Sequence, residues 1–239
     1  MLTPLIAQGP LRVAAAADLE PVLPPILVAF EKATGIHAEA TYQASAMLTT
    51  QIQNGAPFDV FLSADLGYPK RLVDAGLADA RGPVTYAKGT LVLWVRNGSP
   101  VAPASLDSLR SAGLTRLAIA NSDRAPYGRA AVAALTRLKL YDALKPKLAT
   151  AENIAQAAQF ADSGNADAGL ISLTSALTPR MTADGNYFVM PRELYPAIEQ
   201  GAVIVSKTTQ HAAAQKLLDY VLSAPVQAEL ATSGLTPVD

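Results

Sequence analysis

Three short turns of this sequence combine small residues with a polar side chain in a way that suits the binding of a small anion. Asp18 follows four alanines, Ser45 follows Gln43-Ala44, and Tyr127 lies in Ala125-Pro126-Tyr127-Gly128. Each turn leads into an expected helix, and the N-terminus of a helix carries unpaired backbone N–H groups and a partial positive charge. Small side chains leave those N–H groups accessible, which would allow a small anion to bind at such turns. The alternative, which the stretch around Asp18 favours when taken alone, is that Asp18 only caps its helix and the alanines only pack.

Asp18 allows two interpretations. As an N-cap, its side chain accepts a hydrogen bond from its own helix, and only its backbone N–H faces an anion. If its carboxylate instead touches the anion, a proton must lie between them, because an ionised carboxylate only accepts hydrogen bonds. A fully deprotonated dianion would otherwise be repelled at low dielectric. We expect the capping arrangement.

The residue types that metal and acid–base chemistry need are scarce. There are no cysteines, and the two histidines, His37 and His211, lie far apart in the sequence. No metal-ion site and no shared catalytic role is therefore expected for them. Ser45, Tyr127 and Asp65 could form a hydrolytic set, but no histidine or lysine base is placed near a nucleophile and no glycine-rich phosphate loop occurs. We expect that the protein is not an enzyme.

Composition and charge narrow the class of protein further. The chain has 239 residues, of which 50% are hydrophobic and 16% charged, with 19 basic and 20 acidic side chains. This length allows one large domain or two lobes of about 100 residues each. The even charge gives no electrostatic attraction for nucleic acid or an acidic membrane surface. Residues 1–10 are too short for a working signal peptide, and we interpret them as the remainder of a trimmed one.

Strands and helices alternate in the first part of the chain, which places two of the three turns together. The expected elements are strands at 11–17, 36–41 and 58–63, with helices at 24–34, at 45–53, where Ser45 is the expected cap, and at 69–75. Right-handed crossovers put the ends of the first two strands along one edge of a doubly wound sheet. Asp18 and Ser45 should therefore share a rim.

The pattern repeats after a loop rich in Asn, Gly, Ser and Pro at residues 97–103. The expected strands are 90–95, 117–120, 148–151, 168–171, 187–189 and 197–205, and the expected helices are 129–138, 155–163, one opened by Ser172, 210–222 and 225–233. The late return to strands predicts two lobes joined by more than one crossing. We assign residues 1–88 with 197–239 to one lobe and 89–196 to the other, with a ligand cleft between them.

Four blocks of this sequence, in order and spread over both lobes, resemble the periplasmic molybdate-binding proteins that serve ABC-type uptake transporters. The blocks are residues 13–19, 30–35, 51–65 and 125–128, and the third is the most specific. The resemblance implies an α/β periplasmic-binding-protein fold of type II, with two lobes, each a doubly wound sheet flanked by helices. It also implies a periplasmic or otherwise extracytoplasmic monomer without a cofactor, which captures molybdate or tungstate and delivers it to a membrane permease.

In that family a bare tetrahedral oxyanion is held by neutral donors alone, so the molybdenum is bound as its oxyanion and no cation site is needed. Carried over by motif, the implied ligand-binding residues are Ala17, Asp18, Ser45, Tyr127 and Ile154, the last through its backbone, with Ala44, Asn153 and Ser172 as a second tier. Tyr127 is implied to supply a hydroxyl to the anion.

Two positions depart from the family pattern. Asp18 stands where relatives carry serine or another neutral donor, and Ser172 stands where many relatives carry a tyrosine, whose role Tyr127 is expected to fill. Asp18 therefore supports an alternative, in which the same fold binds a protonated tetrahedral oxyanion such as hydrogen phosphate or arsenate. The leading expectation is molybdate or tungstate, with the Asp18 side chain turned away from the ligand.

Overall fold

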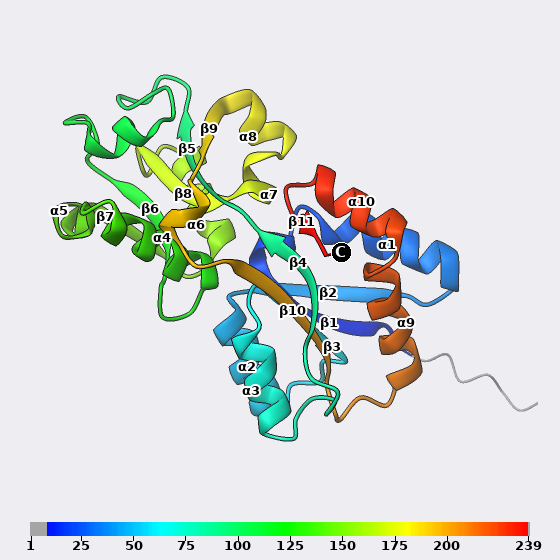
Figure 1. The fold of residues 1–239 in the computed structure, drawn as a ribbon. Helices are drawn as coiled ribbons and strands as arrows, with labels where there is room; N and C mark the ends of the chain where they lie inside the picture. The colour runs from blue at the N-terminus through cyan, green and yellow to red at the C-terminus, as the bar shows by residue number, and fades with distance from the viewer. Residues whose placement is uncertain (1–8, 239) are drawn as a thin grey trace, which may run out of the picture.

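The computed structural model describes residues 9–238, so most of the expected leader lies outside the described residues. The chain forms two lobes, each built on one mixed sheet flanked by helices (Figure 1). This architecture confirms the predicted fold class.

The sheet of the first lobe has the strand order β11-β4-β10-β3-β1-β2. Its strands are β1 (Leu11–Ala16), β2 (Ala38–Gln43), β3 (Val60–Ser63), β4 (Val84–Gly89), β10 (Ile198–Ile204) and β11 (Thr236–Pro237). Its helices are α1 (Leu23–Thr34), α2 (Ser45–Gln53), α3 (Gly67–Asp74), α9 (His211–Val221) and α10 (Ala224–Thr232), with the short 3-10 helix η1 at Ala17–Leu19. β1 runs parallel to β2 and β3, whereas β10 is antiparallel to β3 and β4.

The sheet of the second lobe has the order β7-β6-β8-β5-β9. Its strands are β5 (Leu91–Arg96), β6 (Leu117–Ala120), β7 (Leu148–Ala151), β8 (Ala168–Ser172) and β9 (Gly185–Val189). Its helices are α4 (Pro126–Arg137), α5 (Tyr141–Leu144), α6 (Ile154–Asp162), α7 (Leu173–Ala176) and α8 (Pro179–Asp184), with 3-10 turns η2 (Leu106–Arg110), η3 (Lys145–Lys147) and η4 (Arg192–Leu194). β6 is parallel to β7 and β8.

Strand β1 is buried on both faces of its sheet, which explains its unbroken apolar sequence. Val13 and Ala15 point into a core that includes Phe30 of α1 and Leu217 of α9. Ala14, on the opposite face, joins a second core beneath α2 and α3. A strand held from both sides gives the turn that follows it a rigid base.

Two crossings connect the lobes. The chain passes from β4 to β5 at Thr90, and it returns between Tyr195 and β10. The Leu91 N–H donates a hydrogen bond of 3.1 Å to the Tyr195 hydroxyl, which ties the two crossings together. The lobes are therefore joined along one side, close to the start of β10.

Several sequence predictions need correction. The second strand begins at Ala38 rather than Ile36, and strand β4, which pairs with β10, was not predicted at all. Helix α4 begins at Pro126, three residues earlier than expected, because proline suits the first turn of a helix. Helix α6 likewise begins one residue early, at Ile154.

Three further side chains, those of Trp94, Asp59 and Asp65, have structural partners. Trp94 is fully buried in the second lobe, where its Nε1–H donates to the Met181 carbonyl. Asp59 accepts hydrogen bonds from the Arg12 N–H and the Thr208 hydroxyl. Asp65 accepts one from the Tyr68 N–H at the start of α3. The two aspartates therefore have structural partners.

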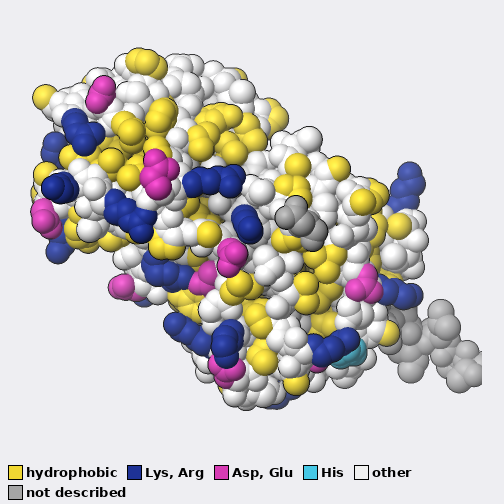
Figure 2. All heavy atoms as spheres, viewed as in Figure 1, with side chains coloured by type: hydrophobic (Ala, Val, Ile, Leu, Met, Phe, Trp, Pro, Cys, Tyr) yellow, Lys and Arg dark blue, Asp and Glu magenta, His cyan; other side chains and the backbone are white. Residues whose placement is uncertain are grey.

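The surface carries charges of both signs. Figure 2 shows Lys and Arg side chains interspersed with Asp and Glu on the face in view. Among residues 9–238, no helix has the length and apolar character needed to cross a bilayer.

Candidate functional site

Four helix starts from both lobes converge on one hollow. η1 follows β1 and α2 follows β2 in the first lobe, and α4 follows β6 and α6 follows β7 in the second. Parallel strands point their carboxyl ends to the same edge of a sheet, which brings these starts to the cleft. The hollow is small, with a volume of about 10 Å³, and is lined by Ala16, Ala17, Asp18, Gln43, Ala44, Ser45, Ala64, Ala125, Pro126, Tyr127 and Ile154.

Backbone N–H groups at these helix starts remain available. Within residues 9–238, the backbone hydrogen bonds outside the helices do not use the N–H of Ser45, Tyr127 or Ile154. As residues of a first helical turn, they also have no acceptor inside their own helix. The hollow thus has unpaired donors from both lobes, each at the positive end of a helix dipole.

Ser45 occupies the first turn of α2, but it is not the cap that the sequence predicted. The N-cap is Ala44, and no side chain caps this helix. The Ser45 hydroxyl oxygen instead accepts a hydrogen bond of 3.1 Å from the Ala64 N–H, across from the end of β3. A hydroxyl has one proton to donate as well, and among the described residues that proton has no acceptor. Ser45 can therefore donate into the hollow.

Asp18 also fails to cap its helix, so the expected orientation of its side chain is wrong. The N-cap position of η1 is Ala16, and no side chain caps η1. The carboxylate is fully buried and its Oδ2 accepts a hydrogen bond from Nε2 of Gln200 in β10. The carboxylate therefore has its buried donor on β10, while Asp18 also lines the hollow.

Burial raises the pKa of the Asp18 carboxyl from 3.8 to about 6, against the lowering effect of the Gln200 amide and the Tyr127 hydroxyl. The Tyr127 hydroxyl lies close to the carboxylate, although it makes no well-formed hydrogen bond with any described residue. The pKa of Asp18 is higher in the folded state than in the unfolded state, so its protonated form favours folding. This contribution to the free energy of unfolding is fully present below pH 3.8. That contribution is lost as the pH rises through about 6.

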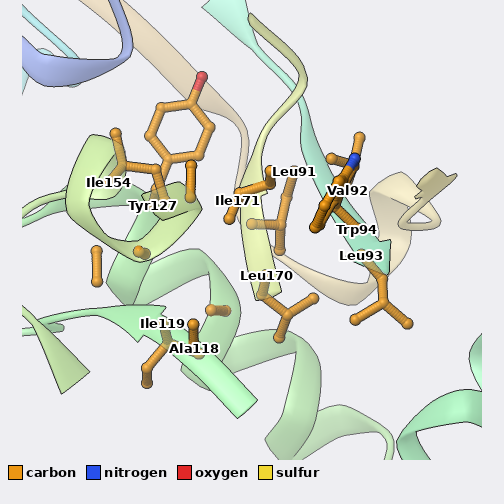
Figure 3. Close-up of a cluster of buried hydrophobic side chains, with 14 of the residues drawn as sticks. Leu91, Val92, Leu93, Trp94, Ala118, Ile119, Tyr127, Ile154, Leu170 and Ile171 are labelled. Carbon is orange, nitrogen blue, oxygen red and sulfur yellow. The ribbon is translucent and has the colours of Figure 1, made fainter. Parts of the chain in front are cut away.

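Tyr127 reaches the site from the second lobe. Figure 3 shows its ring at the margin of the buried apolar cluster around Leu91 and Ile171, with the hydroxyl directed away from that cluster. A Cβ atom at Gly89, on the crossing between the lobes, would lie 2.3 Å from the Tyr127 hydroxyl oxygen. Glycine at position 89 therefore makes room for this hydroxyl.

The structure does not bring Asn153 and Ser172 to the hollow. Asn153 is the N-cap of α6, where its Oδ1 accepts a 2.9 Å hydrogen bond from the Gln156 N–H. The Ser172 hydroxyl oxygen accepts a 3.3 Å hydrogen bond from the Ser175 N–H and lies 2.9 Å from the hydroxyls of Ser175 and Thr174. Both side chains hold helix starts in place, whereas Ala44 does line the hollow.

Gln200 is the residue of this region that the sequence reasoning missed. It is fully buried in β10, far from every motif used to locate the site. The only signal was a polar amide beside the apolar run Ala202–Ile204. Buried amides are rare without partners, so that signal indicated a hydrogen-bonded role but not which partner it served.

Contacts between the lobes surround the hollow and hold it closed. Arg129 of α4 forms an ion pair with Asp65 and donates a 3.2 Å hydrogen bond to the Tyr68 hydroxyl of α3. The Ala46 N–H donates to the Arg124 carbonyl at 3.2 Å, and the Thr174 hydroxyl donates to the Asp18 carbonyl at 2.7 Å. Among residues 9–238, none of those that line the hollow is cationic.

Comparison with known proteins places this arrangement in a family. Residues 11–236 match the family described as bacterial extracellular solute-binding protein. The chain belongs to this family. The molybdate-binding protein ModA of Azotobacter vinelandii is 39% identical over 214 residues, which cover 88% of this chain and 83% of that protein. The ModA of Rhodobacter capsulatus is 35% identical over 215 residues, which cover 90% and 83%.

A solved structure agrees with the sequence relatives. The periplasmic molybdate-binding protein of Azotobacter vinelandii superposes on this solute-binding protein with a TM-score of 0.90 at 31% identity, covering 96% of this chain and 100% of that one. These findings confirm the resemblance stated from the sequence. The family is one of solute-binding proteins that act outside the cytoplasm.

Proposed function

We propose that this protein captures molybdate or tungstate outside the cytoplasm and delivers it to the membrane permease of an ABC transporter. The observation that carries the proposal is the hollow between the lobes, which is lined by unpaired N–H groups and hydroxyls and by no cation. Such a lining suits a small, fully deprotonated tetrahedral oxyanion. The names of the relatives supply the identity of that oxyanion.

Neutral donors can balance a dianion in this setting. Each helix that begins at the hollow contributes a fraction of a positive charge at its N-terminus. Oriented N–H groups form a concave anion site of the same kind as other backbone nests. With the lobes closed, water is excluded, and each of these interactions is stronger than it would be in bulk solvent.

The proposed ligand contacts come from both lobes. They are the backbone of Ala17, Asp18, Ala44 and Ile154 and the hydroxyls of Ser45 and Tyr127, with Asn153 and Ser172 as supports of helix starts. We propose that the lobes divide at residues 88/89 and 196/197, so that closing them completes the site, and that the protein acts as a monomer.

Native mass spectrometry with molybdate, tungstate, sulfate and phosphate in competition tests the proposal. We expect one molybdate or tungstate per chain to be retained when the other two anions are present at equal concentration. Retention of sulfate or phosphate in preference to molybdate would refute the proposed ligand.

Tyr127→Phe separates binding from folding. The Tyr127 hydroxyl is buried without a partner, so its removal should leave the stability of the ligand-free protein unchanged or slightly higher. Molybdate binding should weaken by about 1.5–3 kcal/mol, the usual loss for one hydrogen bond to a charged group. Calorimetry and urea unfolding measure the two quantities.

Tyr86→Phe is a matched control for this change. Tyr86 is also buried near Asp18, but its hydroxyl donates to the Ser63 carbonyl and it does not line the hollow. We expect this variant to lose stability and keep its affinity. If Tyr127→Phe and the unmodified protein bind molybdate with equal affinity, the Tyr127 hydroxyl does not contact the ligand.

A further inference from the structure

Three buried polar atoms in the region of the hollow lack hydrogen-bond partners among the described residues. They are Oδ1 of Asp18, the hydroxyl of Tyr127 and Oε1 of Gln200. The three residues belong to η1, α4 and β10, and Asp18 and Tyr127 also line the hollow. Buried polar atoms without partners are unusual in folded proteins. Asp18 Oδ1 and Gln200 Oε1 can only accept hydrogen bonds, and the Tyr127 hydroxyl carries the one proton of these three groups, so one of the two acceptors is left without a donor among them.

The charges around Asp18 do not favour its ionised form. The titratable side chains that act on it are Tyr127 from α4 and Tyr86 from β4, both buried and neutral, with Tyr195 beyond Tyr127. No lysine, arginine or histidine is among the groups that shift the pKa of Asp18. An ionised Asp18 therefore places an uncompensated negative charge next to the anion site.

The elements packed against η1 bring no cation to Asp18 either. These elements are α6, α7 and β2. Their titratable residues are Asp162, which is paired with Arg180, and Glu39 and Tyr42 of β2, with Glu39 paired to His37. Glu20, next to η1, is exposed and acts on Tyr42. An added dianion would thus face the Asp18 carboxylate with no cationic side chain among these described residues to offset the repulsion between the two negative charges.

We propose that Asp18 carries a proton whenever the oxyanion is bound, so that this protein captures its anion together with one proton from solution. The inference rests on the proposed function. In the free protein near neutral pH, the carboxylate is ionised and accepts from Gln200. When a dianion enters the hollow, one proton from solvent bonds to the carboxylate, which then has an O–H donor. The complex gains one proton and a net charge of −1 relative to the free protein.

The protonated carboxyl also completes the cluster. Its O–H supplies the missing donor to a group in which the Tyr127 and Gln200 oxygens lack partners. Asp18 is in this way a determinant of specificity, because the site accepts a dianion only by neutralising its own carboxylate. A neutral residue at position 18 would bind the same anion without a proton.

Titration calorimetry of the full chain with sodium molybdate, in several buffers of different ionisation enthalpy at pH 7.5, counts the protons. We expect close to one proton taken up per molybdate bound. Affinity should fall by about tenfold per pH unit between pH 7 and 8.5, the slope of a single linked proton. Binding of molybdate without proton uptake would overturn the inference and leave the proposed function standing, whereas no binding of molybdate would overturn both.

Asp18→Asn is the matched variant, since it keeps the shape and the Gln200 contact but cannot titrate. We expect it to bind molybdate with no proton uptake and a flat pH profile. Proton uptake equal to that of the unmodified protein would show that another group titrates, which also overturns the inference.

Gln200→Leu offers a second, independent variant. Removal of the amide takes away a hydrogen bond that stabilises the ionised carboxylate. The pKa of Asp18 in the free protein should therefore rise, and the pH at which affinity begins to fall should move upward. An unchanged pH profile in this variant would contradict the role assigned to Asp18.

Discussion

Saturating molybdate is expected to raise the free energy of unfolding of this protein by about 4 kcal/mol when its free concentration is a thousand times Kd. The gain arises because the hollow exists only when η1 and α2 of one lobe face α4 and α6 of the other. The unfolded chain has no such arrangement of donors, so the ligand binds only the folded state. For a chain of this size, the same free energy corresponds to a rise in Tm of roughly 10 °C.

Differential scanning calorimetry over a series of molybdate concentrations measures this stabilisation. The shift should grow with the logarithm of free ligand, as mass action requires. Sodium sulfate at the same ionic strength is the control and should produce a much smaller shift. A molybdate shift no larger than that of sulfate would contradict specific binding.

Ser45→Ala is expected to lose about 1.5–3 kcal/mol of molybdate affinity, which is roughly a 10- to 150-fold rise in Kd. The Ser45 hydroxyl accepts from the Ala64 N–H, so its orientation is set before the anion arrives and its proton is left to donate. A donor held in place loses little entropy on binding. The substitution also leaves the buried Ala64 N–H without its acceptor, which should cost about 1–3 kcal/mol of stability.

Ser63→Ala is the control that separates the loss of molybdate affinity in Ser45→Ala from its loss of stability. The Ser63 hydroxyl also accepts a backbone hydrogen bond, from the Asp65 N–H at 3.2 Å, and it is fully buried. It does not line the hollow. Ser63→Ala should therefore lose stability but retain affinity, when both variants are measured by calorimetry at a temperature where each is folded. Loss of affinity in Ser63→Ala as great as in Ser45→Ala would point to general destabilisation instead of a lost ligand contact.

The main elements of the fold were predictable because their signals are local. The apolar run of β1 marks a strand covered on both faces, and Gly35 ends α1 in a left-handed conformation with φ of 72°. Strand β4 was missed because its sequence, Val84–Gly89, has no such pattern. Its position depends on pairing with β10, which lies more than a hundred residues further along the chain.

The candidate site was predictable to the level of the turns. Ala17, Asp18, Ala44, Ser45, Tyr127 and Ile154 all line one hollow, because parallel strands and right-handed crossovers bring their carboxyl ends to one edge. Asn153 and Ser172 have the right residue types and neighbouring positions, but their side chains are used by their own helices. Position near a helix start does not determine which way a side chain points.

The sequence by itself determined the two α/β lobes, the turns that meet between them and the absence of cysteine ligands. Only the tertiary structure decided what Asp18 and Ser45 do. When its helix is considered alone, the nearest hydrogen-bond partner of each side chain is a backbone N–H of that helix, so local capping is expected. Asp18 instead meets Gln200, 182 residues away, and Ser45 meets the Ala64 N–H, 19 residues away. Buried groups that lack water must find partners among the groups that the fold places beside them. For these two residues the partners are Gln200 of β10 and the Ala64 N–H just after β3.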